Sequence, residues 1–279
     1  MTMADLSLRF LTPKGIRPGL PLFIYLPGMD GTGRLLGPQL SGLGALFDIR
    51  CLSIPPDNLL GWEGVLAQLS HLIRGEKEST PSRPIVLCGE SFGGCLALQL
   101  AAHFPHLCDR LILVNPASSA SSQSWMGWGA SITRWLPATL YRFSTLGLLP
   151  LLIEPHRVSS SNQEALLRAM QSVTPRTAAW RISMLSEFIL ERLPLARILQ
   201  PAMVLASGAD RILPSVAEAR KLFRYLPNLR SVLLPESGHA CLLESRIQLA
   251  GIIQSHGFCS ATDESSRRSP ATLKGSRAP

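Results

Sequence analysis

The sequence has too little of several features to support a metal centre, a secreted disulfide-bonded protein or a membrane span. Its six cysteines are scattered, without a Cys-x-x-Cys pair or alternation with histidine, so we expect free thiols and no metal site. The N-terminus has an early acidic residue and no apolar core, unlike a secretory signal. No apolar run approaches the ~20 residues of a membrane helix, and the most apolar one, 146–153, is interrupted by Pro150. We therefore expect a cytoplasmic protein, either free or bound peripherally at a membrane surface.

Charged residues are also scarce, at 16% of the chain, and the positive ones are nearly all arginine. The formal net charge of +8 is carried by 23 Arg and only 4 Lys. Arginine suits lipid phosphates and carboxylates as well as nucleic acid. No nucleic-acid-binding motif accompanies it, and the aromatic residues are not interleaved with basic runs, so we expect no nucleic-acid partner. Hydrophobic residues make up 46% of the chain, which a core and an apolar substrate channel or membrane-facing surface would explain.

What the sequence does contain is a Gly-x-Ser-x-Gly pattern at 89–93, between an apolar strand and a helix of small residues. This order is typical of a nucleophile elbow, in which a sharp turn lifts the serine hydroxyl clear of the sheet. Gly89 and Gly93 would have to lack side chains because the two arms of the turn pass too close for a Cβ. The bare pattern is weak, since Gly and Ser are common residues. The flanking strand and helix make Ser91 a candidate nucleophile.

A serine hydroxyl is a poor nucleophile at neutral pH, so catalysis at Ser91 needs a histidine base and an orienting carboxylate. Asp210 and His239 each follow a strand expected late in the chain, in the order Ser, Asp, His that α/β hydrolases use. Each alone also fits a structural role, Asp210 as a helix start and His239 as a surface loop residue. Asn115 stands where some hydrolases carry the acid, but an amide cannot be the charged partner. Together the three residues predict a triad of Ser91, Asp210 and His239.

The oxyanion hole should combine the amide after the nucleophile with an amide from the loop after an early strand. The strand expected at 22–26 is followed by a glycine-rich loop at 27–33. We therefore predict the backbone amides of Met29 and Phe92 as the donors. A phosphate-binding loop is the alternative, but neither Gly-Lys-Ser/Thr nor the dinucleotide spacing of glycines is present. We expect no organic cofactor.

Strand-like and helix-like segments alternate along the chain, which predicts an α/β fold: a mostly parallel sheet with helices on both faces. The hydrolase domain should span 1–259, and 260–279, poor in large apolar residues, should be a disordered tail. We expect strands at 22–26, 47–53, 85–88, 111–114, 202–206 and 230–234 with an edge strand at 6–10, and helices at 35–44, 62–73, 92–103, 215–225 and 242–255.

Residues 118–197 separate two of these strands by far more than an ordinary loop, and long insertions of this kind tend to be functional. The segment is helical and amphipathic, with four of the five tryptophans, at 125, 128, 135 and 180. We predict a helical lid over Ser91 whose inner face lines an acyl pocket, although packing between lid helices would account for at least half of these side chains. Its eight Arg against four Glu would also suit an anionic membrane surface. Within it we expect helical stretches at 146–153, 162–173 and 177–190.

Three runs, at 25–33, 88–94 and 113–119, resemble the α/β-hydrolase superfamily, and the resemblance extends over about 18–258. They look like the hydrolase half of the plastid phytyl ester synthase and diacylglycerol acyltransferase-like proteins, because Pro27-Gly28 replaces the usual His-Gly. The resemblance implies transfer of fatty acyl groups to phytol or diacylglycerol from acyl carrier protein, acyl-CoA or galactolipid. It also implies a nucleophile, acid and base at Ser91, Asp210 and His239.

The plant proteins continue into a second, acyltransferase-like domain with a His-x4-Asp motif, and this sequence has no such pair. We therefore expect hydrolysis slightly more than transfer. The sequence thus predicts a serine esterase, lipase or thioesterase of lipid metabolism that forms an acyl-enzyme from a lipophilic ester or thioester. Two alternatives stay open: a chlorophyll-ester or prenyl-ester hydrolase that differs only in its pocket, and a catalytically silent hydrolase-fold protein that binds a ligand.

Overall fold

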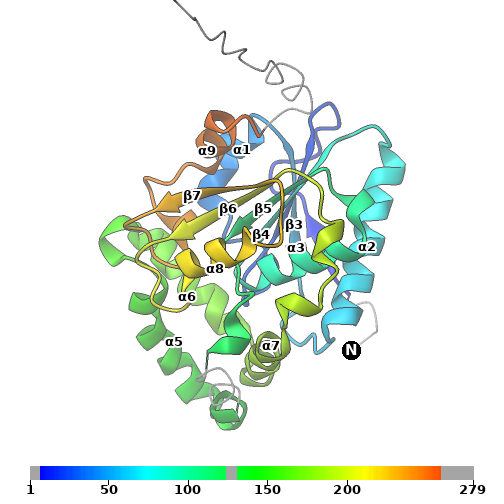
Figure 1. Ribbon diagram of the computed structural model, residues 1–279. Helices are drawn as coiled ribbons and strands as arrows, with labels where there is room; N and C mark the ends of the chain where they lie inside the picture. Colours follow the sequence, from blue (N-terminus) through cyan, green and yellow to red (C-terminus); the bar gives the residue numbers. More distant parts are fainter. Residues whose placement is uncertain (1–6, 124–130, 259–279) are drawn as a thin grey trace, which may run out of the picture.

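A seven-stranded sheet lies at the centre of the computed structural model, which describes residues 7–123 and 131–258 (Figure 1). The strand order is β1-β3-β2-β4-β5-β6-β7, and every neighbouring pair is parallel except β1 with β3. This confirms the predicted α/β fold. The strands are β1 (Arg9–Leu11), β2 (Leu22–Leu26), β3 (Asp48–Ser53), β4 (Ile85–Glu90), β5 (Arg110–Val114), β6 (Ala202–Ser207) and β7 (Leu229–Leu234).

The central strands are buried on both faces, which is why their sequences are almost continuously apolar. Along β2, Ile24 packs into the layer beneath one set of helices, while Phe23 and Tyr25 pack into the layer on the other face. In Figure 1, α2, α3 and α8 lie in front of the sheet, with α1 and α9 behind it. The bounds are α1 (Leu40–Gly44), α2 (Trp62–Ser79), α3 (Phe92–His103), α8 (Ser215–Leu222) and α9 (Leu249–Ser255).

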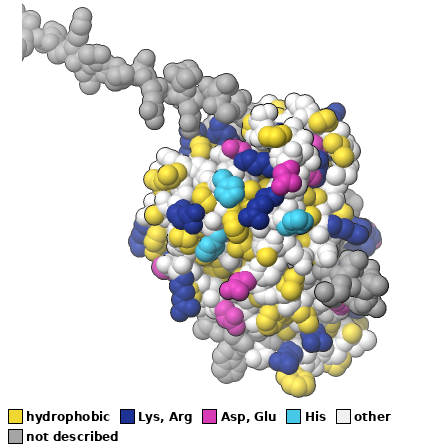
Figure 2. Space-filling view, turned by 90° about the vertical axis from the view of Figure 1, so that its right-hand side faces the viewer, with side chains coloured by type: hydrophobic (Ala, Val, Ile, Leu, Met, Phe, Trp, Pro, Cys, Tyr) yellow, Lys and Arg dark blue, Asp and Glu magenta, His cyan; other side chains and the backbone are white. Residues whose placement is uncertain are grey.

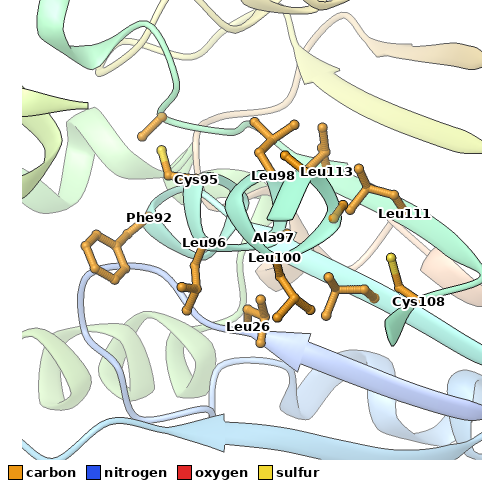
Figure 3. Packing of buried hydrophobic residues seen from close by; sticks show 14 of the residues in the cluster. Leu26, Phe92, Cys95, Leu96, Ala97, Leu98, Leu100, Cys108, Leu111 and Leu113 are labelled. Carbon is orange, nitrogen blue, oxygen red and sulfur yellow. The ribbon is translucent and has the colours of Figure 1, made fainter. Parts of the chain in front are cut away.

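Helix α3 is buried from Phe92 to Ala102, which its mostly small and apolar side chains allow. Figure 3 shows its leucines and Cys95 packed in one layer with Leu26 of β2 and with Leu111 and Leu113 of β5. All of these side chains are almost completely shielded from solvent. Because α3 begins at Phe92, directly after the candidate nucleophile, this packing fixes the position of the turn that carries Ser91.

Three helices between β5 and β6 lie below the sheet in Figure 1: α5 (Ala138–Leu152), α6 (Ser160–Ser172) and α7 (Pro175–Glu187). We call them the insertion helices. Ser159 and Thr174 cap α6 and α7 by accepting hydrogen bonds from backbone amides of the first turn. The helical stretches predicted at 146–153, 162–173 and 177–190 thus overlap observed helices. The predicted lid residues Trp125 and Trp128 lie outside the described residues, as does the predicted tail.

Several element boundaries differ from the predicted ones. The edge strand begins at Arg9, α8 ends at Leu222, and 3-10 turns replace the first parts of the helices expected at 35–44 and 242–255. The last change has a visible cause, because the buried Gln39 side chain donates to the carbonyls of Leu242 and Ile247, each at 2.8 Å. Its amide oxygen also accepts from the backbone amide of Leu249 at 2.8 Å. These bonds satisfy backbone groups that a continuous helix would otherwise have paired.

The five cysteines in the described ranges are buried free thiols, as the sequence predicts: Cys51, Cys88, Cys95, Cys108 and Cys241. In the same ranges no helix is long and apolar enough to cross a membrane. Figure 2 shows the face that α2 covers, where basic, acidic and histidine side chains are interspersed with apolar ones.

A buried ionic cluster joins the starts of three central strands. Asp48 is fully buried and accepts hydrogen bonds from Arg50, at 2.8 Å, and from Arg83. Arg50 also pairs with Glu76 of α2 at 2.6 Å, and Arg83 donates to the Leu20 carbonyl at 2.7 Å. Burial alone would raise the pKa of Asp48, but the two guanidinium groups lower it below its ordinary value.

We expect Asp48→Asn to lower the free energy of unfolding by about 3–5 kcal/mol, because it leaves buried arginines without their counter-charge. Since the folded pKa of Asp48 is depressed, its contribution is present above about pH 4 and is lost as the pH falls through the folded value. Urea denaturation at pH 7 and at low pH checks both points. The exposed Asp57→Asn is the matched control. Equal stability of the two variants at pH 7 would contradict the prediction.

Candidate active site

The turn between β4 and α3 holds Ser91 in a strained backbone conformation, with φ 52° and ψ −113°. A non-glycine residue adopts positive φ only where its surroundings enforce it. Here the Ser91 amide donates to the Val114 carbonyl at 3.0 Å, and its carbonyl accepts from the amides of Gly94 and Ala117 at 2.9 and 3.1 Å. These bonds tie the turn to the end of β5 and to the loop that follows it.

The glycines on either side of Ser91 are required by close backbone contacts. A Cβ on Gly89 would lie 2.2 Å from the Gly93 carbonyl oxygen, and one on Gly93 would lie 2.1 Å from the Leu26 carbonyl oxygen. Both distances are far below van der Waals contact. The elbow geometry that the sequence predicts is therefore present, and it exists only because these two positions lack side chains.

The structure brings the three predicted triad side chains into one hydrogen-bonded row. His239 Nε2 lies 2.9 Å from Ser91 Oγ, and His239 Nδ1 lies 2.7 Å from Asp210 Oδ2. Asp210 is on the loop after β6 and His239 on the loop after β7, so all three side chains meet at the carboxyl edge of the parallel strands. A hydroxyl, an imidazole and a carboxylate thus lie in one hydrogen-bonded row, which is the geometry that a serine triad requires.

Asp210 accepts hydrogen bonds from several donors in addition to His239. Its Oδ1 accepts from the amides of Ile212 and Leu213 at 2.9 and 3.0 Å, and its Oδ2 also accepts from the Ser215 hydroxyl. Burial alone would raise the pKa of Asp210, but these hydrogen bonds and the charge of His239 lower it below the ordinary value. The carboxylate is thus charged and fixed in direction. The hydrogen bond from Ser215 to Asp210 was not predicted from the sequence.

Asn115, excluded above as the triad acid, connects the loops that carry Asp210 and His239. Its backbone has φ 42°, a conformation that asparagine tolerates better than most residues. Its Nδ2 donates to the His239 carbonyl at 2.7 Å and to the Ser207 hydroxyl at 2.8 Å, and its Oδ1 accepts from the Ser207 amide at 2.8 Å. The buried amide therefore holds the ends of β5, β6 and β7 in register.

Met29 and Phe92, the predicted oxyanion donors, both lie beside the serine. A Cβ on Gly28 would be 3.8 Å from Ser91 Cβ, which places the loop after β2 against the nucleophile. Phe92 is the first residue of α3, where backbone amides have no acceptor within their own helix. Its ring stacks on Trp62 at a centroid distance of 4.9 Å. The role of the Met29 and Phe92 backbone amides as oxyanion donors stays a prediction.

A cavity of about 210 Å³ opens beside Ser91 and His239. The insertion helices supply much of its apolar lining: Leu148 and Leu152 from α5, Leu166 and Met170 from α6, and Ile182 and Leu185 from α7. Ile212, Leu213 and Leu243 close the lining on the side of the sheet loops. The space next to Ser91 is therefore suited to an aliphatic group rather than to a charged one.

Two carboxyl groups, the half-buried Asp30 and the buried Glu90, also reach this cavity, and neither was singled out from the sequence. Burial raises the pKa of Glu90 to about 7, against the opposing effect of the hydrogen bond it accepts from Tyr25. Burial likewise raises the pKa of Asp30 above its ordinary value, opposed by hydrogen bonds from Thr32. In residues 7–123 and 131–258, no three His, Cys, Asp or Glu side chains are grouped so that they could hold a metal ion.

Comparison with known proteins assigns the class. The sequence profile of the alpha/beta hydrolase fold family matches residues 65–245, which is more than half of the chain. The chain therefore belongs to this family, and it is an enzyme of the α/β-hydrolase class.

Two curated relatives come from Arabidopsis thaliana. Phytyl ester synthase 1, chloroplastic, is 34% identical over 85% of this chain, and phytyl ester synthase 2, chloroplastic, is 30% identical over 84%. The matched region makes up only 37% of the length of each plant protein. A third relative, a pimeloyl-[acyl-carrier protein] methyl ester esterase of Nitrosomonas europaea, is 30% identical over 65% of this chain and 84% of its own. The resemblance predicted from the sequence is confirmed.

Solved structures of esterases have the same fold. An esterase from Thermogutta terrifontis superimposes with a TM-score of 0.70 over 91% of this chain and 94% of that one, at 20% identity. The esterase RhEst1 from Rhodococcus sp. ECU1013 superimposes with a TM-score of 0.71 over 89% of this chain and 93% of that one, at 15% identity. At such low identity these matches establish the architecture alone.

Proposed function

We propose that this protein is a serine-dependent enzyme that forms an acyl-enzyme from lipophilic esters or thioesters. The observation that supports the proposal most strongly is the hydrogen-bonded row of Ser91, His239 and Asp210 at the mouth of an apolar cavity. The nucleophile and the pocket for an aliphatic group thus lie side by side. The names of the relatives, phytyl ester synthases and a methyl ester esterase, fit ester chemistry at such a site.

In the proposed acylation step, Ser91 Oγ attacks the substrate carbonyl carbon while His239 Nε2 takes the hydroxyl proton. The carbonyl oxygen becomes an oxyanion, held by the amides of Met29 and Phe92. When the intermediate collapses, the bond to the alcohol or thiol breaks, and the leaving group receives the proton from His239. Asp210 fixes the tautomer of His239 and stabilises the imidazolium that forms in between.

Deacylation repeats these events with a second nucleophile. Water or an acceptor alcohol gives its proton to His239 and attacks the acyl carbonyl, and the proton then returns to Ser91 as the acid or new ester leaves. The insertion helices are proposed as the lid predicted from the sequence, since their apolar side chains cover the cavity. Whether water or an alcohol is the acceptor then depends on how far this lid admits water to the acyl-enzyme. We propose a soluble or membrane-peripheral enzyme that acts on lipophilic substrates.

Two other functions fit the same fold. A prenyl-ester or chlorophyll-ester hydrolase would use the same chemistry with a different pocket occupant. A catalytically silent ligand-binding protein would not need the charged and fully hydrogen-bonded Asp210 that this chain retains. Labelling by a fluorophosphonate probe separates the silent protein from both enzymes, because only an activated serine reacts.

Ser91→Ala is expected to abolish fluorophosphonate labelling and to lower turnover of a long-chain nitrophenyl ester by about three orders of magnitude or more, because the triad acts as a unit. Ser79→Ala, at an exposed position near the end of α2, is the matched control and should label like wild type. A folded Ser91→Ala protein that keeps more than roughly a tenth of the wild-type rate would rule out Ser91 as the nucleophile.

Asp210→Asn is expected to reduce kcat on the order of 10⁴-fold, as in other serine triads, because the amide permits the wrong His239 tautomer. Glu236→Gln is the matched control. Its carboxylate is exposed and pairs with Arg157, and it should leave kcat unchanged. Steady-state kinetics on the purified variants check both. A damaging Glu236→Gln and a harmless Asp210→Asn would mean that the wrong carboxylate has been assigned.

Hydrolysis and transfer can be separated by product analysis. In detergent with a long-chain acyl donor and phytol or diacylglycerol, we expect Ser91-dependent free acid as the main product, because water is the acceptor in excess and the triad serves either acceptor. Mass spectrometry of extracted lipids quantifies acid against new ester. Ser91-dependent ester as the dominant product would overturn this expectation and establish a transferase.

A further inference from the structure

A buried arginine of the insertion helices reaches the predicted oxyanion loop. Arg181, on α7, has only 2% of its surface exposed. Its Nη1 donates to the Met29 carbonyl at 2.6 Å, and its Nη2 donates to the Pro55 carbonyl in the loop after β3, at 3.1 Å. The proposed mechanism gives this side chain no role, yet it contacts a residue of the reaction centre.

The contacted residue lies within a tight turn. The Gly31 amide donates to the Gly28 carbonyl at 3.0 Å, so that Met29 is the second residue of a four-residue turn. Turns of this kind differ chiefly in the orientation of their central peptide, and the carbonyl of that peptide is the one that Arg181 binds. Gly31 has φ +68°, and a Cβ on it would lie 2.7 Å from Arg181 Nη1. The guanidinium therefore packs directly on the turn and restrains Met29 through its carbonyl, and the Met29 amide lies in the preceding peptide, on the other side of the same Cα.

The helix that carries Arg181 is itself fixed to the same region. Trp180 Nε1 donates to the Leu60 carbonyl at 3.1 Å, and Trp62 Nε1 donates to the Met184 carbonyl at 2.9 Å. These bonds lie on either side of Arg181 along α7. The guanidinium thus reaches the turn from a rigid support, which is the condition for holding a backbone group within a few tenths of an ångström.

The guanidinium is cationic despite its burial. Burial lowers the pKa of Arg181 to about 10, against the opposing charges of Asp30 and Tyr141, so the group stays protonated at neutral pH. A buried cation is costly unless hydrogen-bonded. The two carbonyls and the neighbouring Asp30 carboxyl provide this compensation, and Met29 and Asp30 also line the cavity.

We propose that Arg181 is a positioning residue that holds Met29 so that its backbone amide is directed at the oxyanion. This rests on the proposed function, in which that amide is one of the two donors. The insertion helices then do more than line the pocket, because α7 completes the oxyanion hole through Arg181. An oxyanion donor acts on the transition state and not on the bound ester, so Arg181 should affect kcat and leave substrate binding nearly unchanged.

The test compares Arg181→Ala and Arg181→Lys with Arg176→Ala, a matched control at an exposed position of the same helix. The substrate is a long-chain nitrophenyl ester, and the probe is an alkyl trifluoromethyl ketone, whose adduct with a serine carries an oxyanion. Arg181→Ala should lower kcat by about tenfold to a hundredfold and lower the affinity for the trifluoromethyl ketone by a similar factor. KM should change by less than about threefold. Arg181→Lys should retain part of the activity, because one ammonium cannot bind both carbonyls in the same way. Arg176→Ala should match wild type.

Added guanidinium separates positioning from general destabilisation. It should restore part of the kcat of Arg181→Ala and should not raise the activity of Arg176→Ala or Ser91→Ala. Circular dichroism and thermal melting identify variants that fail to fold. If Arg181→Ala fails to fold, Arg181→Lys tests the positioning role instead, by the same criterion of a lowered kcat with a nearly unchanged KM.

The proposal is overturned if folded Arg181 variants keep kcat within about twofold of wild type, or lose activity with neither weaker ketone binding nor rescue. Failure of the proposed function looks different. In that case the wild-type protein neither turns over the ester nor binds the ketone covalently, whereas failure of the Arg181 proposal alone leaves a wild-type enzyme that does both.

Discussion

The close approach of α3 to the ends of β4 and β2 is the constraint on which the site depends. At Gly93 the backbone comes so near the Leu26 carbonyl that a Cβ would lie only 2.1 Å away, and Gly89 is equally restricted. With no side chain at either position, the chain can turn sharply enough to hold Ser91 at φ 52°. The strain is offset by the fully buried packing of α3 and by backbone hydrogen bonds to the end of β5. The fold thus places a serine where the loops after β2, β6 and β7 converge.

Two buried carboxyl groups, Asp210 next to His239 and Glu90 next to Ser91, differ in charge because they accept different hydrogen bonds. Burial raises the pKa of both, but Asp210 accepts from two backbone amides, a hydroxyl and His239, and its pKa ends below the ordinary value. Glu90 accepts from Tyr25, and its pKa ends at about 7. Asp210 therefore carries the negative charge that the proposed role of His239 as a base requires. Glu90 is therefore largely uncharged below neutral pH.

Much of this arrangement could be predicted from the sequence, because the signals involved are local. Central strands such as β5 and β6 are buried on both faces and appear as continuous apolar runs, with Asp210 and His239 directly after strands. The side chains that position these residues could not be found in the same way. Asn115 contacts His239 across 124 positions, and Arg181 contacts Met29 across 152. The broken helix at 242–255 has a similar origin, since its partner Gln39 lies 210 positions away from Leu249.

In the proposed mechanism, Ser91 carries the acyl group during turnover. The most direct measurement is intact-protein mass spectrometry after rapid mixing with a long-chain acyl thioester and quenching in acid, followed by mapping of the modified peptide. We expect a mass increase equal to one acyl group on the peptide that contains Ser91, and no increase in Ser91→Ala. Turnover without any adduct, or an adduct on another residue that persists in Ser91→Ala, would contradict it.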